Sequence, residues 1–142
     1  MPVLHPATSL TLLATAGLLG ACDQLHEPHP EELIDDVWHK AKLRGVAFRA
    51  IGQEPGWLLE IKNGEEILLV TDYGSTRTSM PYVEPIVYQE ERRTQYVLEG
   101  YKTIVEIRGE RCTDVMSGEE FEVTVTIKQT DRELQGCGRA LF

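Results

Sequence analysis

The chain has 142 residues and a formal net charge of −9, with 42% hydrophobic and 26% charged residues. This length suits one domain with a single core, and the composition is that of a globular protein rather than a disordered one. Residues 1–21 contain no Asp, Glu, Lys or Arg, so the negative charge lies on residues 22–142. Because a field of this sign repels nucleic acid, we expect no nucleic-acid partner.

The N-terminus carries an apolar run, residues 10–19 (L-T-L-L-A-T-A-G-L-L), that is too short to span a bilayer. Its length and position favour the hydrophobic part of a secretory signal. It ends in Leu19-Gly20-Ala21-Cys22, which resembles the bacterial lipobox. The resemblance implies that residues 1–21 are a signal peptide and that Cys22 becomes the acylated first residue. The alternative is a short buried helix with an inert thiol.

Export also decides what we expect of the other two cysteines, Cys112 and Cys137. Outside the cytoplasm two such thiols are expected to form a disulfide, which would stabilise the fold by roughly 3–4 kcal/mol on the chain-entropy model. One cysteine then carries lipid and two form a bridge. The sequence therefore predicts a cell-envelope protein, lipid-anchored through Cys22 to the inner or outer membrane and facing the periplasm.

Residues 22–30 are predicted to be a tether, because they contain two prolines and no periodicity. His26 and His29, beside Asp23 and Glu27, are residue types that bind zinc, but a tether interrupted by proline has little to fix their geometry. We therefore expect no metal and no cofactor.

Residues 31–44 have the pattern of an amphipathic helix that Gly45 can end. The apolar face consists of Leu33, Ile34, Val37, Trp38 and Ala41. We expect this face to pack on its own domain. A membrane-surface or partner helix is the alternative, which the acidic first turn disfavours.

From residue 46 onward the chain is predicted to be β. Strands are expected at 46–52, 57–62, 65–71, 82–88, 94–99, 101–108, 121–128 and 132–138. Seven or eight short, closely joined strands predict a mainly β fold, either a small antiparallel up-and-down barrel or a curled meander. With the N-terminal helix this domain would span residues 31–142.

Three local signals refine this picture. Glu54-Pro55-Gly56-Trp57 favours a type II turn. Asn63-Gly64 favours a two-residue hairpin, which would pair Trp57 with Val70 and leave two apolar faces, one of them for the helix to cover. The last signal is an alternating strand, in which one face is expected to hold Phe121, Val123, Val125 and Ile127.

Two polar segments, 72–81 and 113–120, are predicted to be loops and are the longest such segments in the domain. Because binding residues concentrate on loops held by a rigid scaffold, we take them as candidate contact surfaces. The candidate binding residues are Tyr73, Ser75, Arg77, Asp114, Ser117 and Gly118.

Catalysis finds little support in the sequence. Residues 45–142 contain no histidine, which excludes a Ser-His-Asp or Cys-His site on the β domain alone. Glu54 and Asp114 could form a carboxylate pair of the glycosidase kind, but each has a local structural role open to it. Trp57 is expected to anchor the core. The sequence therefore predicts a binding protein and not an enzyme.

Three sequence blocks now stand together behind the lipobox, at 48–57 (F-R-A-I-G-Q-E-P-G-W), 112–121 (C-T-D-V-M-S-G-E-E-F) and 134–138 (L-Q-G-C-G). They resemble a family of bacterial envelope lipoproteins with the blocks F-x-A-x-G-x-E-P-x-W, C-x-D-x-M-S and L-x-G-C. The resemblance implies a small secreted β domain without an established activity, sometimes found near heat-shock lipoproteins of the META type. The motif positions, expected to be mainly structural, are Phe48, Gly52, Glu54, Pro55, Trp57, Cys112, Asp114, Met116, Ser117, Gly136 and Cys137.

A further stretch, Ser117-Gly118-Glu119-Glu120-Phe121, is similar to the S-G-x-x-Y loop of the periplasmic inhibitors of c-type lysozyme. A domain with a charge of −9 would be steered toward a cationic protein such as a lysozyme. The sequence thus leaves two leading function hypotheses: a non-catalytic envelope binding or maintenance module with a cationic envelope partner, and an inhibitor of c-type lysozyme. An enzyme is the third possibility, and a barrel interior that holds a ligand is the fourth.

Overall fold

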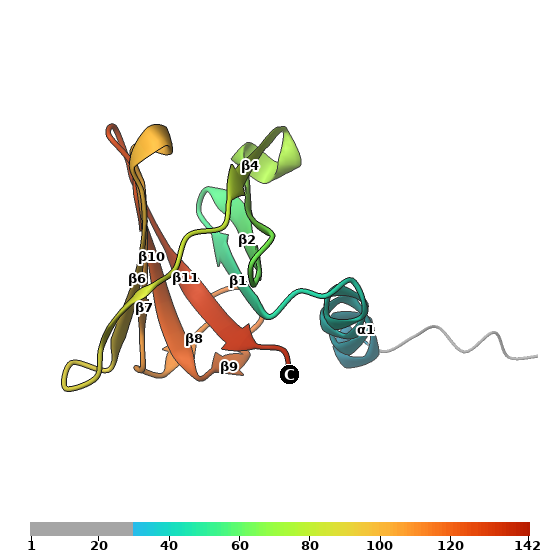
Figure 1. The fold of residues 1–142 in the computed structure, drawn as a ribbon. Helices are drawn as coiled ribbons and strands as arrows, with labels where there is room; N and C mark the ends of the chain where they lie inside the picture. The colour runs from blue at the N-terminus through green and yellow to red at the C-terminus, as the bar shows by residue number, and fades with distance from the viewer. Residues whose placement is uncertain (1–29) are drawn as a thin grey trace, which may run out of the picture.

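A computed structural model of the chain describes residues 30–142, with side chains from Val37 onward. The predicted signal peptide 1–21, the predicted lipidation site Cys22 and the predicted tether up to residue 29 lie outside the described residues. The fold is mainly β: a nine-stranded antiparallel sheet curls strongly into a half-barrel, beside a two-stranded sheet and a short N-terminal helix (Figure 1).

The elements follow one another closely along the chain. They are α1 (Pro30–Leu43), β1 (Phe48–Gln53), β2 (Gly56–Lys62), β3 (Glu66–Thr71), η1 (Asp72–Gly74), β4 (Thr76–Pro81), β5 (Ile86–Tyr88), β6 (Arg93–Leu98), η2 (Glu99–Tyr101), β7 (Thr103–Arg108), β8 (Cys112–Thr113), β9 (Glu120–Phe121), β10 (Val123–Lys128) and β11 (Glu133–Ala140).

The large sheet has the order β4-β3-β2-β1-β11-β10-β7-β6-β5. Strands next to each other in this sheet are also successive in the chain, except that β1 pairs with β11 and that the β8–β9 hairpin is inserted between β7 and β10. The sheet is therefore the curled meander of the two arrangements that the sequence left open. Its edges are β4 and β5, and the edge position of β5 agrees with Pro85 directly before it.

The large sheet has one strand more than the predicted eight because the segment 72–81 is not a loop, and β8 and β9 form the additional small sheet. Only residues 72–75 form a turn, and Thr76–Pro81 is strand β4, paired with β3 from Thr71↔Thr76 to Glu66↔Pro81. Its polar composition reflects an edge strand that is largely exposed, while Met80 is buried in the core. The predicted binding residue Arg77 therefore lies on a strand.

The predicted two-residue hairpin at Asn63-Gly64 is wrong by one residue. Lys62 pairs with Glu66, so the loop has three residues and Gly64 adopts a φ of +73°. This register places Ile61 opposite Ile67 and thereby matches apolar side chains on the inner face.

The predicted type II turn at 54–57 is also displaced by one residue. Gln53 pairs with Gly56, so Glu54 and Pro55 occupy the centre of the turn, and the peptide bond between them is cis.

A further correction concerns Phe121, which does not share a face with Val123 and its successors. The chain bends at Glu122, which breaks the alternation. Phe121 belongs to β9 and packs in a small cluster with Trp38 and Cys137, whereas Val125 and Ile127 of β10 belong to the main core.

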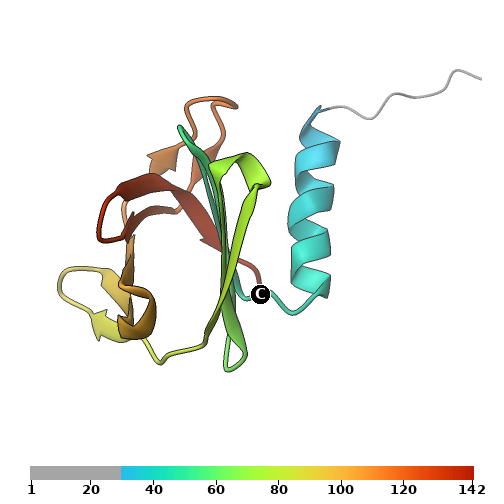
Figure 2. The same ribbon diagram turned by 90° about the horizontal axis from the view of Figure 1, so that it is seen from above.

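Helix α1 lies against the outer side of the sheet (Figure 2). Its apolar face does pack on the domain, through Trp38, which contacts the cluster around Phe121 and Cys137, and through the buried Ala41. The predicted cover of the hairpin 57–71 is replaced by a cover over β1, β11 and β9. Arg44, just beyond the helix, pairs with Glu60 of β2. Val37 of the predicted face is exposed.

The inner side of the curled sheet is filled with apolar side chains from β1 to β11. They are Ala50, Trp57, Leu59, Ile61, Ile67, Leu69, Met80, Tyr96, Leu98, Val105, Val125, Ile127 and Leu134. Burial of this set is the main favourable term in folding a domain of this size.

One joint in this core is unusually tight. The indole of Trp57 lies across β1 and β11, and its Nε1 donates a hydrogen bond of 3.2 Å to the carbonyl of Gln135. Beneath the ring lie Gly52 and Gly136, and a Cβ on Gly136 would stand 2.7 Å from Cζ2 of Trp57 and would collide with the carbonyl oxygen of Ile51. The predicted role of Trp57 as a core anchor thus depends on glycine at both positions.

This joint yields a stability prediction. Gly136→Ala should lower the free energy of unfolding by about 3 kcal/mol or more, because the new methyl group meets backbone and a buried ring that have no room to move. Gly100→Ala is the matched control, since a Cβ there meets nothing within 4 Å, and we expect it to change stability by less than about 1 kcal/mol. Denaturant unfolding of both variants measures this, and equal effects would contradict the account of the joint.

Candidate functional site

The most distinctive exposed feature is the turn between β8 and β9, residues 114–119, which we call the Asp114 turn. Two apolar side chains form its tip: Val115 is 85% exposed and Met116 is 70% exposed. Gly118 follows with a φ of +73°, a conformation that glycine adopts without strain.

Asp114 holds this turn together from the inside, and only 5% of it is exposed. Its Oδ2 accepts hydrogen bonds from the amide of Ser117 at 2.9 Å and from the Ser117 hydroxyl at 2.7 Å. The backbone closes the turn a second time, because Asp114 donates to the carbonyl of Glu119 and Gly118 donates to the carbonyl of Asp114. These bonds give Asp114 a local structural role.

The electrostatics of Asp114 follow from this arrangement. Burial by itself raises the pKa of the carboxyl group, but hydrogen bonds from the side chain and amide of Ser117, from Gln53 and from the amide of Met116 outweigh it. The net result is a pKa below the usual range for aspartate. Asp114 is therefore a charged acceptor near neutral pH and a poor proton donor.

One disulfide bond and one ion pair fix the turn and its flanking strand to the large sheet. Cys112 at its start forms a disulfide with Cys137 of β11, with an S–S distance of 2.01 Å and a Cα–Cα distance of 5.4 Å, which confirms the predicted bridge. Glu119 at its end accepts a 2.7 Å ion pair from Arg139, also on β11. The turn is thus held at both ends by the same strand.

A groove separates the Asp114 turn from helix α1, with a volume of about 330 Å³. Its walls are mostly apolar, from Val37 and Trp38 of the helix and Ile51 of β1, and Gln53 and Ser117 contribute polar atoms. Cation–π contacts from Arg49 and Arg139 hold the indole of Trp38 at 5.2 and 5.0 Å. The groove is therefore a preformed recess beside the exposed tip.

The β1–β2 turn joins the two segments that the sequence selected as candidate loops. Gln53 lines one cavity together with Asp114, and on the other side the ring of Tyr73 lies against Gly56. Glu54 and Pro55 between them are exposed. The structure thus brings Tyr73 of η1 and the Asp114 turn to either side of one motif-bearing turn.

The remaining predicted residues have other surroundings. The Ser75 hydroxyl donates to the carbonyl of Asp72 at 2.7 Å and so stabilises its own turn. Arg77 is exposed on the edge strand β4. Glu54 and Asp114, the candidate carboxylate pair, do line one cavity of about 280 Å³, but Oδ2 of Asp114 accepts both hydrogen bonds from Ser117 and the lowered pKa makes Asp114 a poor acid.

Sequence reasoning missed the apolar tip and the groove. The tip had a visible signal, because Val115 and Met116 are consecutive apolar residues in a segment predicted to be polar loop. The groove had none, since it arises only when α1 packs beside β1 and the Asp114 turn.

Comparisons with protein-family models, with curated proteins and with solved structures found no match to this chain. The resemblance to envelope lipoproteins therefore remains a prediction from the sequence blocks. In the structure these blocks meet: Gly52 and Trp57 of the first contact Gly136 of the third, and the Cys112–Cys137 bridge joins the second to the third. Among residues 30–142, no helix is long and apolar enough to cross a bilayer.

The role of Asp114 leads to a pH prediction. Because its pKa is lowered in the folded protein, the stability it provides is present above about pH 4, the ordinary range for aspartate, and is lost as the pH falls through the lowered pKa. Asp114→Asn should therefore cost about 2 kcal/mol at pH 7. Its difference from the parent chain should shrink as the pH falls from about 4 toward the lowered pKa of Asp114.

Denaturant unfolding between pH 2 and pH 7 measures this difference, and comparison with the parent chain removes the contribution of other carboxylates. Asp131→Asn, in the exposed turn before β11, is the control and should change stability by less than about 0.5 kcal/mol at every pH. A cost for Asp114→Asn that stays constant down to pH 2 would contradict a charge-dependent role.

Proposed function

We propose that this chain is a non-catalytic binding module of the bacterial cell envelope, anchored to a membrane through lipid on Cys22. The observation that carries the proposal is the Asp114 turn, which holds Val115 and Met116 in solvent on a support fixed at both ends. Exposed apolar side chains that gather on a surface commonly mark an interaction site.

Preorganisation is the physical advantage of such a turn. A flexible loop loses about 0.5–1.5 kcal/mol for each side chain immobilised on binding, whereas this turn is already ordered by Asp114 and by its ties to β11. The recess between the turn and α1 can receive a side chain of the partner while Val115 and Met116 contact its surface. The net charge of −9 favours a cationic partner.

The envelope location is supported by the disulfide together with the leader-like N-terminus. A bridge between Cys112 and Cys137 fits an oxidising compartment, and the lipobox-like Leu19-Gly20-Ala21-Cys22 supplies a route to it. The lipid would attach the domain to the membrane through the tether 22–30 and helix α1. Contact with a partner would then occur at the membrane surface.

The anchor gives a direct prediction. Protein isolated from its own cells should have a mass that begins at Cys22, carries acyl chains and lacks two hydrogens at Cys112 and Cys137. Cys22→Ser should move the protein out of the membrane fraction, because stable attachment depends on the acyl chains. An intact leader with three free thiols in mass spectrometry would reject both the anchor and the location.

The contact surface gives a second prediction. Crosslinking in intact cells, followed by purification, should capture a partner with the parent chain, and replacement of both Val115 and Met116 by Asp should reduce the yield by at least tenfold. The physical reason is that two charges replace the exposed apolar contact. Circular dichroism should show an unchanged fold, since both side chains already face solvent.

Leu43→Asp supplies the matched control, because Leu43 is also a largely exposed apolar residue but lies at the end of α1, outside the residues that line the groove. It should capture the same partner at the parent level. If the Val115 and Met116 variant retains the partner, or if Leu43→Asp loses it equally, the Asp114 turn is not the contact surface.

Inhibition of c-type lysozyme is the second candidate, favoured by the position of Ser117-Gly118 in an exposed turn on an acidic domain. The Ser117 hydroxyl donates to Asp114 and accepts from the amide of Glu119 at 3.2 Å, so one lone pair remains for a partner. Purified residues 23–142 should then slow a c-type lysozyme at micromolar concentration, and Ser117→Ala should weaken inhibition about tenfold. Full lysozyme activity at that concentration would exclude this candidate.

A further inference from the structure

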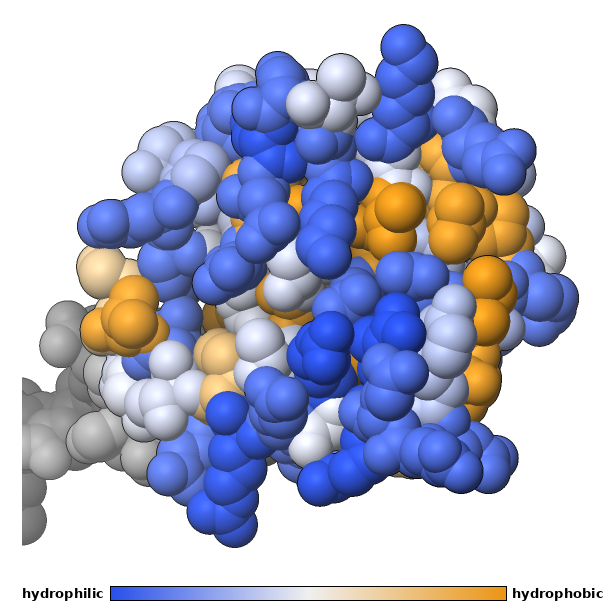
Figure 3. Space-filling model, turned by 90° about the vertical axis from the view of Figure 1, so that its left-hand side faces the viewer, coloured by the Kyte–Doolittle hydropathy of each residue, from blue (hydrophilic) through white to orange (hydrophobic). Residues whose placement is uncertain are grey.

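A second recess lies away from the Asp114 turn, on the outer face of β6, β7 and β10. This face is seen in Figure 3, where exposed apolar residues lie between charged ones. The recess has a volume of about 410 Å³, which is within the range of roughly 300–1,000 Å³ that small-ligand pockets span.

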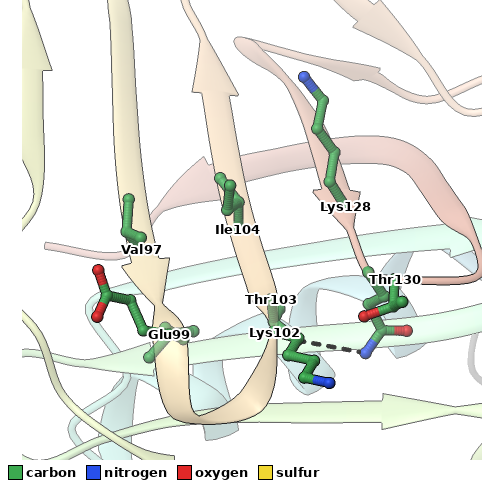
Figure 4. A pocket seen from close by; sticks show the side chains of 9 residues that line it. Val97, Glu99, Lys102, Thr103, Ile104, Lys128 and Thr130 are labelled. Carbon is green, nitrogen blue, oxygen red and sulfur yellow. Dashed lines mark hydrogen bonds between the residues drawn. The ribbon is translucent and has the colours of Figure 1, made fainter.

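The floor of this recess is apolar because of the strand register. Val97 of β6 pairs with Ile104 of β7, so both side chains lie side by side on the outer face. The methylene stem of Lys128, which pairs with Ile104 from β10, continues the floor toward the third strand. Figure 4 shows Val97, Ile104 and Lys128 side by side on the three strands, with Glu99 below Val97 and Lys102 at the hairpin end.

Two hairpin tips form the other walls. One is η2 with Lys102 behind it, and the other is the turn after β10, with Gln129 and Thr130. A hydrogen bond of 3.5 Å from Gln129 Nε2 to Thr103 Oγ1 joins the two tips. The Thr130 hydroxyl and the Lys102 ammonium thus lie at the same end of the recess (Figure 4).

The charge of the recess is opposite in sign to that of the whole protein. Lys102 and Lys128 line it against one acid, Glu99, which gives +1 on a chain of −9. Lys128 is only loosely paired, at 3.9 Å from Glu106, because that carboxylate is also contacted by Arg108 at 2.8 Å and Arg93 at 3.6 Å. Among residues 37–142, whose side chains the structure describes, Lys102 has no ion-pair partner at 4.0 Å or less.

We propose that this recess binds a single-chain amphipathic anion of the fatty-acid class. The carboxylate would lie at Lys102 and Thr130, and the alkyl chain would run along Val97 and Ile104 toward the stem of Lys128. An apolar floor with a cation and a hydroxyl donor at one end matches such a molecule in both its parts. The site is separate from the Asp114 turn, and this proposal does not depend on the binding function proposed above.

The test is titration of the oxidised full chain with sodium decanoate below its micelle concentration, followed by the backbone NMR shifts. Saturable shifts should be confined to residues around 97, 104 and 130. Lys102→Gln should weaken decanoate binding about tenfold through loss of the cation, and Val97→Thr should weaken it severalfold through loss of apolar floor. Arg111→Gln, which removes another exposed cation, next to the Asp114 turn, should leave the affinity unchanged.

Two further probes separate the alternatives. Decyltrimethylammonium carries the same chain with the opposite charge and should not bind at this recess. Vesicles of phosphatidylglycerol present anionic head groups without a free chain and should not shift the same residues. The proposal is overturned if decanoate shifts spread over the whole surface, if the cation binds equally well, if only the vesicles act, or if Lys102→Gln and Arg111→Gln have equal effects.

Discussion

The pairing of β1 with β11, sealed by Trp57 lying over Gly52 and Gly136, is the constraint on which the rest of the structure depends. It joins the first and last strands of the domain and so turns a linear meander into a curled sheet with a filled inner side. The indole fits only because both strands have glycine where the ring crosses them, at Gly52 and Gly136. Packing of this kind tolerates no added volume, because protein interiors have the density of organic crystals.

The Asp114 turn takes its position from the same pair of strands. β11 supplies Cys137 for the disulfide and Arg139 for the ion pair with Glu119, and Gln53 of β1 lines the same groove as Asp114. Helix α1 is joined to this assembly through Trp38, so the groove, the turn and the helix are parts of one packed unit. A partner that binds the turn would therefore contact a surface set by the core, and little of its binding energy would go into ordering a loop.

The sequence predicts those features that local chemistry decides. The alternation of apolar and polar residues predicts β10, and the helical pattern predicts α1 within one residue at each end. An odd number of cysteines together with a lipobox implies the 112–137 bridge. It fails where tertiary contacts choose between local options. The register of the 57–71 hairpin follows from matching Ile61 with Ile67 on the inner face, and β4 exists because β3 offers a free edge to a polar segment. The groove exists because α1 packs on β1 and β11 and not on the hairpin. No local sequence pattern predicts that packing.

The central claim is that the core, the disulfide and Asp114 hold Val115 and Met116 in a fixed, exposed position. Backbone ¹⁵N relaxation of residues 114–119, measured in the oxidised protein and after reduction of the bridge, tests it most directly. The account predicts order parameters of about 0.85 in the oxidised form, equal to those of the neighbouring strands, and a fall below about 0.6 on reduction. Low order parameters for the turn in the oxidised protein would contradict it.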